Sequence, residues 1–392
     1  MSHNFSAFYY DHPYARSCRS KVTACEESGH GYAVRLERTC FYPEGGGQPG
    51  DTGVIVPVDD PEAAVRVTDT RERDGNSVHI TDKPLEPGTE VDARIDWERR
   101  YDFMQQHTGE HIFSGLVNRR FGYDNVGFHM NEDFMTFDFN GDLSEADIAV
   151  LETEVNRAIQ RNIATVAGIP EGDPNTLTYR SKLELTGDVR LVTIPDFDTC
   201  ACCGLHVAET GEIGVFKIVD RMTYKGGVRL TALAGMRAYR DYQRKHRTVR
   251  ALMSELSTAE TELEQAVRDL NDKLAAGERE LRAANELAAR MYAEAHPDRL
   301  IIWFTDNFDT KAVKYMALAM AETAPFGAVI LVPLGEREYT LALAGETVDA
   351  ATLREALAPF DFRGGGNRGL IQGKLKGEEA DIRAALRQWS EA

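Results

Sequence analysis

The segment His107-Thr108-Gly109-Glu110-His111 decides how this chain must fold, because its two histidines are four residues apart. Residues at this spacing lie on one face of an α-helix, with their Cβ atoms about 5–6 Å apart. A second segment, Cys202-Cys203-Gly204-Leu205-His206, adds a thiol and an imidazole later in the chain. Zn²⁺ prefers four nitrogen and sulfur ligands in a tetrahedral arrangement. The two segments therefore predict one zinc site, and the fold has to bring them together.

The same residue types have a second interpretation. Histidines at helical spacing occur by chance, and the cysteines could be reduced residues of a hydrophobic core. Because two half-sites occur within one domain-sized stretch, we favour the metal site.

Composition describes an ordinary globular protein. The chain has 392 residues, of which 42% are hydrophobic and 28% charged, enough for about two or three domains with apolar cores. Three of the six cysteines are bunched at 200, 202 and 203, a pattern that favours metal binding in a reducing compartment over a disulfide framework. The first residues lack a secretory signal pattern, and no run of apolar residues is long enough to span a membrane. We therefore expect a cytoplasmic protein.

The net charge of −18 argues against a generic nucleic-acid coat, because phosphate contacts need Lys and Arg. An acidic enzyme with a small neutral substrate is the alternative. Two local clusters of basic residues could still contact nucleic acid. They consist of Arg237, Arg240, Arg244, Lys245, His246, Arg247 and Arg250, and of Arg363, Arg368, Lys374 and Lys376.

Patterning divides the chain into four parts, so the fold class is α+β. Residues 1–92 alternate apolar and polar positions between turns, which predicts a small antiparallel β-barrel or sheet. Residues 93–237 mix helix and strand and hold the metal ligands. A helix is expected over 102–121, a strand over 134–139 and a helix over 144–162, with Ser144 and Asp147 at its N-terminal cap. Residues 202–206 are expected in a loop.

The C-terminal parts have different patterns. Residues 238–297 keep a 3–4 spacing of apolar residues, typical of a coiled-coil linker. It is either one long helix or a hairpin with its tip at Gly277. Residues 298–392 predict a compact α/β domain with buried strands at 300–304 and 328–332. A glycine-rich loop at 364–369 precedes a final helix near Gly377 and does not fit a Rossmann or Walker motif.

Several ordered motifs carry a resemblance to a known family. They are residues 41–53 (FYPEGGGQPGDTG), 104–108 (MQQHT), 127–129 (GFH), 210–214 (TGEIG), 225–229 (KGGVR) and 364–368 (GGGNR) with 372–373 (QG). In this order they resemble the freestanding alanyl-tRNA editing proteins, which are similar to the editing domain of alanyl-tRNA synthetase. Residues 364–368 together with 372–373 resemble the C-terminal DHHA1 module of those synthetases. The resemblance covers nearly the whole chain.

The resemblance implies a trans-editing hydrolase that deacylates mischarged tRNA(Ala), chiefly Ser-tRNA(Ala) and secondarily Gly-tRNA(Ala). A pocket that fits alanine cannot strongly reject serine, whereas a second site that hydrogen-bonds the serine hydroxyl can recognise it. The implied zinc ligands are His107, His111, Cys202 and His206. Cys203 stands where the family usually has glycine, so it remains a possible substitute ligand. Four protein ligands favour an organising zinc over a catalytic one, although both stay open.

Other site residues are also implied. Candidates for the polar catalytic lining are Gln106, Thr108, Glu110 and His129, of which His129 could instead be structural and Glu110 is not a family hallmark. Candidates for tRNA contacts are Gly45, Gly46, Gly47, Lys225, Arg229, Arg363 and Arg368. From residue types alone, Gly45–Gly47 could be only a tight turn. The coiled coil and the C-terminal domain, expected to bind tRNA, could also form a homodimer.

Two rival functions remain. Residues 107–111 formally match the H-x-x-E-H motif of a metallopeptidase family, with Glu110 as the general base. The second half-site, with cysteine and histidine, does not suit that chemistry. The other rival is a non-catalytic zinc-containing protein that binds tRNA or senses metal.

Overall fold

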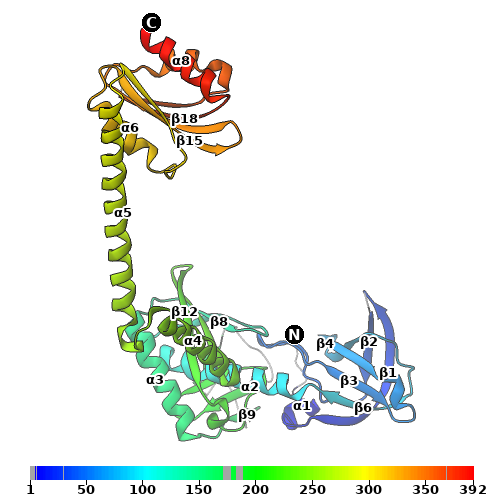
Figure 1. Cartoon of the computed structure of the whole chain (residues 1–392). Coiled ribbons are helices and arrows are strands. Elements are labelled where there is room, and N and C mark those ends of the chain that lie inside the picture. Colours follow the sequence, from blue (N-terminus) through cyan, green and yellow to red (C-terminus); the bar gives the residue numbers. More distant parts are fainter. Residues whose placement is uncertain (1–4, 6, 30, 171–177, 182–188, 368) are drawn as a thin grey trace. The chain divides into compact units, whose positions relative to one another are not determined.

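The structure is a computed structural model that describes residues 5, 7–29, 31–170, 178–181, 189–367 and 369–392 (Figure 1). The chain forms two compact units, residues 1–248 and 249–392. We describe each unit by itself.

The first unit begins with the short helix α1 (Phe8–Asp11) and a closed antiparallel barrel. Its strands are β1 (Ser17–Ser28), β2 (Gly31–Leu36), β3 (Gly53–Pro57), β4 (Val65–Arg73), β5 (Asn76–Thr81) and β6 (Glu90–Ile95), in the order β1-β2-β5-β4-β3-β6, with the 3₁₀ turn η1 (Pro61–Ala63) before β4. Alternate residues such as Val22, Val34 and Val67 point inward and form the barrel core. The predicted N-terminal barrel is confirmed.

Helix α2 (Trp97–Phe121) runs through the interior of the first unit (Figure 1). It begins before the predicted start at residue 102 and is capped by Gly122, whose backbone is left-handed and donates its N–H to the carbonyl oxygen of Asn118. Every residue from Phe103 to Val117 is buried. Both histidines of the first half-site therefore lie in a water-excluded environment.

Two small sheets and helix α3 surround α2. The four-stranded sheet has the order β12-β13-β8-β7 and the three-stranded sheet the order β11-β10-β9. Their strands are β7 (Asn125–Met130), β8 (Met135–Phe139), β9 (Val166–Gly168), β10 (Leu191–Ile194), β11 (Asp198–Ala201), β12 (Phe216–Tyr224) and β13 (Gly227–Ala234), with the turn η3 (Thr210–Ile213) between β11 and β12. Helix α3 (Glu145–Arg161) starts with a capping box between Ser144 and Asp147, as predicted.

The helical region differs from both alternatives drawn from the sequence. It consists of α4 (Gly235–Leu256), the turn η4 (Glu260–Glu262) and α5 (Leu263–Ala295). Gly277 lies inside α5, so it is not the tip of a hairpin, and the break falls at Ser257, whose φ is 51°. A helix cannot continue through a left-handed residue. The apolar residues Val267, Leu270, Leu274, Leu281 and Met291 of α5 are 44–62% exposed, and coiled-coil pairing stays a prediction.

The second unit contains a five-stranded sheet of order β14-β15-β16-β18-β17. Its strands are β14 (Leu300–Phe304), β15 (Gly327–Gly335), β16 (Glu338–Ala344), β17 (Arg363–Asn367) and β18 (Leu370–Lys376). The helices α6 (Val313–Ala321), α7 (Ala350–Ala356) and α8 (Glu379–Glu391), with the turn η5 (Ala358–Phe360), complete it. β14 and β15 are parallel and their first residues are buried, as the apolar runs predicted.

The predicted glycine-rich loop at 364–369 is wrong for residues 364–367. These residues belong to the edge strand β17 and pair with β18. A Cβ on Gly364 would lie 2.3 Å from the carbonyl oxygen of Gln372. The glycines therefore allow close approach of a second backbone rather than an open loop. Within the residues the structure describes, no helix has the length and apolar character needed to cross a membrane.

Candidate metal centre

Four side chains from the two half-sites meet inside the first unit. The ligand atoms of His107, His111, Cys202 and His206 all lie within 4.8 Å of one another. The Cys202 sulfur is 3.4 Å from His107 Nε2 and 4.0 Å from His206 Nε2. In a tetrahedral zinc site with the usual bond lengths, neighbouring ligand atoms are about 3.4–3.8 Å apart. The donor set therefore fits Zn²⁺, with the Cys202–His206 separation slightly longer than in a closed tetrahedron.

The other nitrogens of two of these rings are held by polar side chains. His107 Nδ1 lies 3.1 Å from Gln48 Oε1, and His111 Nδ1 lies 2.9 Å from Asp198 Oδ2. Asp198 also accepts two hydrogen bonds from Arg180, both of 2.7 Å. Metal-binding histidines usually donate their second N–H in this way, which leaves the other nitrogen free for the ion. His206 Nδ1 is buried and has no hydrogen-bond partner among the described residues.

The electrostatics of the cluster favour a thiolate. Burial by itself would raise the pKa of the Cys202 thiol, but His107 and His111 outweigh it and hold that pKa well below its usual value. Burial also opposes a charge on His111, yet the hydrogen bond to Asp198 raises its pKa to about 10. Burial lowers the pKa of His206 to about 3. The thiolate is the form of cysteine that binds a cation, and the proton that His111 holds at neutral pH would have to leave when a cation binds.

The loop that carries the second half-site is held in place from several sides. Arg190 donates to the carbonyl oxygens of Cys202 and Gly204, each at 2.9 Å. A Cβ on Gly204 would lie 2.1 Å from His107 Cε1. Only glycine therefore lets this loop pass so close to the helix.

Cys203 does not join the cluster. The hydroxyl of Tyr10 donates to the Cys203 carbonyl oxygen at 2.9 Å. Burial raises the pKa of the Cys203 thiol to about 11. His111, Asp198 and Cys200 form a second group with the right residue types. Asp198 is already paired with Arg180, and burial raises the pKa of the Cys200 thiol. The geometry thus favours Cys202 as the thiolate ligand.

Three of the predicted catalytic residues form hydrogen bonds within the protein. The amide of Gln106 exchanges hydrogen bonds with the backbone of Ala234 in β13. Glu110 accepts hydrogen bonds from Ser114 and Asn125. Thr108 contacts the ligand loop, since its hydroxyl accepts the N–H of Val207.

His129 lies on β7 and is exposed. Its neighbour Phe128 faces the candidate metal ligand His107, with the two ring centroids 4.9 Å apart. Because successive strand residues point to opposite faces, His129 points away from that ring. Its catalytic role stays a prediction.

The glycine-rich segment reaches from the barrel to the metal centre. The backbones of Gly45 and Gln48 exchange two hydrogen bonds and close a tight turn. Gly46 and Gly47 have φ angles of 58° and 81°, and a Cβ on Gly47 would lie 2.7 Å from the Phe128 ring. The turn that residue types suggested is present, and contact with tRNA stays a prediction.

The predicted tRNA-binding cations lie in both units. Lys225 is exposed at the turn between β12 and β13, and Arg229 pairs with Asp138 while lying over the Tyr224 ring. Arg363 is exposed at the start of β17 and pairs with Asp361. Arg368 is outside the described residues.

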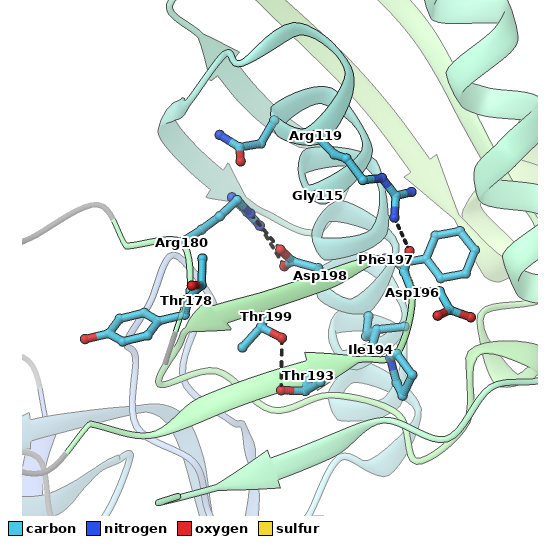
Figure 2. Close-up of a pocket in the computed structure, with 13 residues that line it drawn as sticks. Gly115, Arg119, Thr178, Arg180, Thr193, Ile194, Asp196, Phe197, Asp198 and Thr199 are labelled. Carbon is cyan, nitrogen blue, oxygen red and sulfur yellow. Dashed lines mark hydrogen bonds and ion pairs between the residues drawn. The ribbon is translucent and has the colours of Figure 1, made fainter. Parts of the chain in front are cut away.

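A pocket of about 380 Å³ lies behind the metal centre, between α2 and the β10–β11 hairpin (Figure 2). Figure 2 shows the Arg180–Asp198 pair on its wall and the hydrogen bond from Thr199 to Thr193 beside it. Sequence reasoning missed Gln48, Arg180 and Asp198. Gln48 lay within the quoted 41–53 motif, and Asp198 is an acidic residue just before the cysteine cluster, but neither position indicated a contact with the candidate ligands.

Two segments of the chain match known protein families. Residues 11–99 match a family model described as tRNA synthetases class II (A), and residues 189–231 match the threonyl and alanyl tRNA synthetase second additional domain. The class is therefore that of proteins related to tRNA synthetases.

Named relatives narrow the class. The alanyl-tRNA editing protein AlaX-L of Pyrococcus horikoshii is 27% identical over 95% of this chain and 95% of its own. The alanyl-tRNA editing protein Aarsd1 of Rattus norvegicus is 28% identical over 96% of each chain. An alanine–tRNA ligase of Pyrobaculum neutrophilum is 31% identical over 97% of this chain but only 44% of its own. The chain belongs to the family of alanyl-tRNA editing proteins.

Proposed function

We propose that this protein is a trans-editing hydrolase that deacylates mischarged tRNA(Ala), with Ser-tRNA(Ala) as its main substrate. The observation that carries the proposal is the buried cluster of His107, His111, Cys202 and His206 in a chain similar to alanyl-tRNA editing proteins over nearly its whole length. Gly-tRNA(Ala) is the secondary substrate. A reaction on aminoacyl-tRNA belongs in the cytoplasm, where translation takes place.

The site residues act mainly by positioning. His107, His111, Cys202 and His206 would hold Zn²⁺, which when bound supplies a fixed positive charge and a rigid geometry. Because four protein side chains fill a tetrahedral shell, we assign the ion an organising role. Thr108 holds the ligand loop against α2, and Phe128 excludes water from His107.

Selectivity follows from the hydroxyl group that serine has and alanine lacks. A hydroxyl that is hydrogen-bonded in the editing site gives serine an advantage that alanine lacks. The ester bond to the terminal ribose is activated, so positioning of water and exclusion of alanine are the main requirements. We propose Gln106, Thr108, Glu110 and His129 as the residues to test for this lining.

We propose four functional regions that follow the sequence pattern. They are a barrel domain (1–92), a zinc-containing editing domain (93–237), a helical linker (238–297) and a DHHA1-like tRNA-binding domain (298–392). The exposed cations Arg240, Arg247 and Arg250 of α4 suit phosphate contacts. Arg237 of the same cluster is buried and paired with Asp102, so it is not available to RNA.

A homodimer is the further part of this proposal. The apolar residues of α5 recur at 3–4 spacing and are exposed, as in a helix that pairs with a second copy.

A non-catalytic zinc-containing tRNA-binding protein is the second candidate, because the filled ligand shell resembles a structural zinc site. A metallopeptidase is a weaker candidate. Its motif would use Glu110 as the general base, and the Glu110 carboxylate accepts hydrogen bonds from Ser114 and Asn125. Incubation of the purified protein with Ser-tRNA(Ala), with a chelator and with a test peptide separates the three. Ester cleavage supports the editing hydrolase, binding without cleavage supports the second candidate, and peptide cleavage supports the third.

A further inference from the structure

Gln48 connects the glycine-rich turn to both halves of the metal centre. Its side chain is 1% exposed. Its Oε1 lies 3.1 Å from His107 Nδ1 and 3.1 Å from the backbone nitrogen of Leu205. His107 belongs to the first half-site and Leu205 to the second. One amide oxygen therefore contacts both ligand-bearing segments, although Gln48 belongs to neither.

The contact with Leu205 fixes the orientation of the amide. A backbone N–H can only donate, so the Gln48 atom that faces it must be the oxygen. The same oxygen faces His107 Nδ1, which must then carry the proton. A neutral imidazole protonated on Nδ1 has its lone pair on Nε2. His107 Nε2 is the atom 3.4 Å from the Cys202 sulfur, on the side where the ion would bind.

We propose that Gln48 is a positioning residue of the metal centre. It holds His107 in the tautomer that presents Nε2 to the ion, and it holds the loop of Cys202 and His206 at a fixed distance from α2. Asp198 holds the Nδ1 of His111 in the same way. The inference rests on the proposed zinc site, but it does not depend on which aminoacyl-tRNA is cleaved.

The close packing around Gln48 defines which substitutions test this role. Gln48 is 1% exposed, and even a Cβ added at Gly204 would lie only 3.2 Å from its Oε1, so the side chain is closely surrounded. Gln48→Met keeps the length of the side chain but removes the acceptor. Gln48→Glu keeps both the length and an acceptor. Gln48→Asn keeps the amide but withdraws it by one methylene group.

The test is titration of the metal-free full-length protein with Co²⁺, which reports affinity and, through its absorption bands, thiolate and imidazole ligation. Loss of an outer partner of a metal ligand typically lowers affinity about 10–100-fold. We expect Gln48→Met to bind Co²⁺ weaker by that factor with altered bands, and Gln48→Glu to stay within about threefold of the parent. Gln372→Met, on the exposed face of β18, is the matched control and should leave the titration unchanged.

Circular dichroism of each metal-free variant separates loss of fold from loss of ligation. If Gln48→Met does not fold, Gln48→Asn takes its place with the same expected loss. Parent-like affinity and bands in Gln48→Met, or equal losses in Gln48→Glu and Gln48→Met, would overturn the inference. So would a parent protein that binds no Co²⁺. Because no tRNA is used, a protein that binds metal but deacylates nothing overturns the proposed function alone.

Discussion

The hydroxyl of Thr108 accepts a hydrogen bond from the backbone N–H of Val207 at 3.1 Å and donates one to the carbonyl oxygen of Met104 at 2.7 Å. Thr108 follows His107, the first candidate metal ligand, and Val207 follows His206, the last. This buried hydroxyl therefore ties the helix that carries His107 to the loop that carries His206.

Thr108→Val should weaken this connection while keeping the side-chain shape. The Val207 N–H would be left buried without a partner, which costs about 1–3 kcal/mol. We expect a lower free energy of unfolding in denaturant titrations, and weaker Zn²⁺ binding. Thr153→Val is the matched control, because Thr153 also donates to the carbonyl four residues before it but is exposed on α3. Equal effects of the two substitutions would show that the contact with Val207 contributes nothing.

Gly204→Ala should abolish stoichiometric metal binding. The new Cβ would lie 2.1 Å from His107 Cε1 and 2.3 Å from His107 Nδ1, so the loop or the ring must move. Elemental analysis of the purified variant measures the outcome. Gly277→Ala is the control, since nothing lies within 4 Å of its Cβ position in α5, and it should stabilise that helix by about 0.5–1 kcal/mol. Full metal occupancy in Gly204→Ala would contradict the observed packing.

The buried His79 should make the barrel sensitive to acid. Burial lowers its pKa from 6.5 to about 4 in the folded state. The unfolded chain thus takes up a proton as the pH falls through 6.5, whereas the folded chain does so only near 4. This contribution to stability is complete above pH 6.5 and is lost as the pH falls towards 4, amounting to about 3 kcal/mol at most.

Free energies of unfolding measured from pH 7 to pH 4 check this expectation. His79→Gln should show a shallower decline than the parent over that range. His246→Gln replaces an exposed histidine of α4 and should decline like the parent. Identical slopes for His79→Gln and the parent would show that His79 does not titrate in this way.

The exposed basic side of α4 should contribute to tRNA affinity. Replacing Arg240, Arg247 and Arg250 together with alanine should weaken tRNA binding. Each lost phosphate contact should reduce the slope of log affinity against log salt by about 0.7–0.9. Arg268, Arg279 and Arg282 of α5 form a matched triple-alanine control. An unchanged salt slope in the α4 variant would remove this surface from the tRNA interface.

Much of the fold could be predicted from local patterns. The barrel followed from strict alternation, and α3 followed from the Ser144–Asp147 capping box. The break at Ser257 could not be predicted, because serine has no strong preference for the left-handed backbone found there. Likewise, residues 364–367 form a strand only because β18 offers a backbone for them to pair with.

In the candidate site too, residues related by local spacing could be predicted, whereas contacts between distant parts of the sequence could not. The spacing within each half-site predicted four residues that the structure brings together. It could not reveal Gln48, which lies 59 residues from His107 and has no spacing relation to it. Phe128 was part of a motif, yet only the strand orientation shows that it, and not His129, faces His107.

The proposed editing activity is tested most directly by the initial rates of deacylation of Ser-tRNA(Ala) and Ala-tRNA(Ala), measured with the parent protein and with Cys202→Ala. We expect rapid hydrolysis of Ser-tRNA(Ala), little hydrolysis of Ala-tRNA(Ala), and loss of the serine reaction in Cys202→Ala. Equal hydrolysis of both substrates by the parent, hydrolysis of neither, or full serine activity in Cys202→Ala would contradict it.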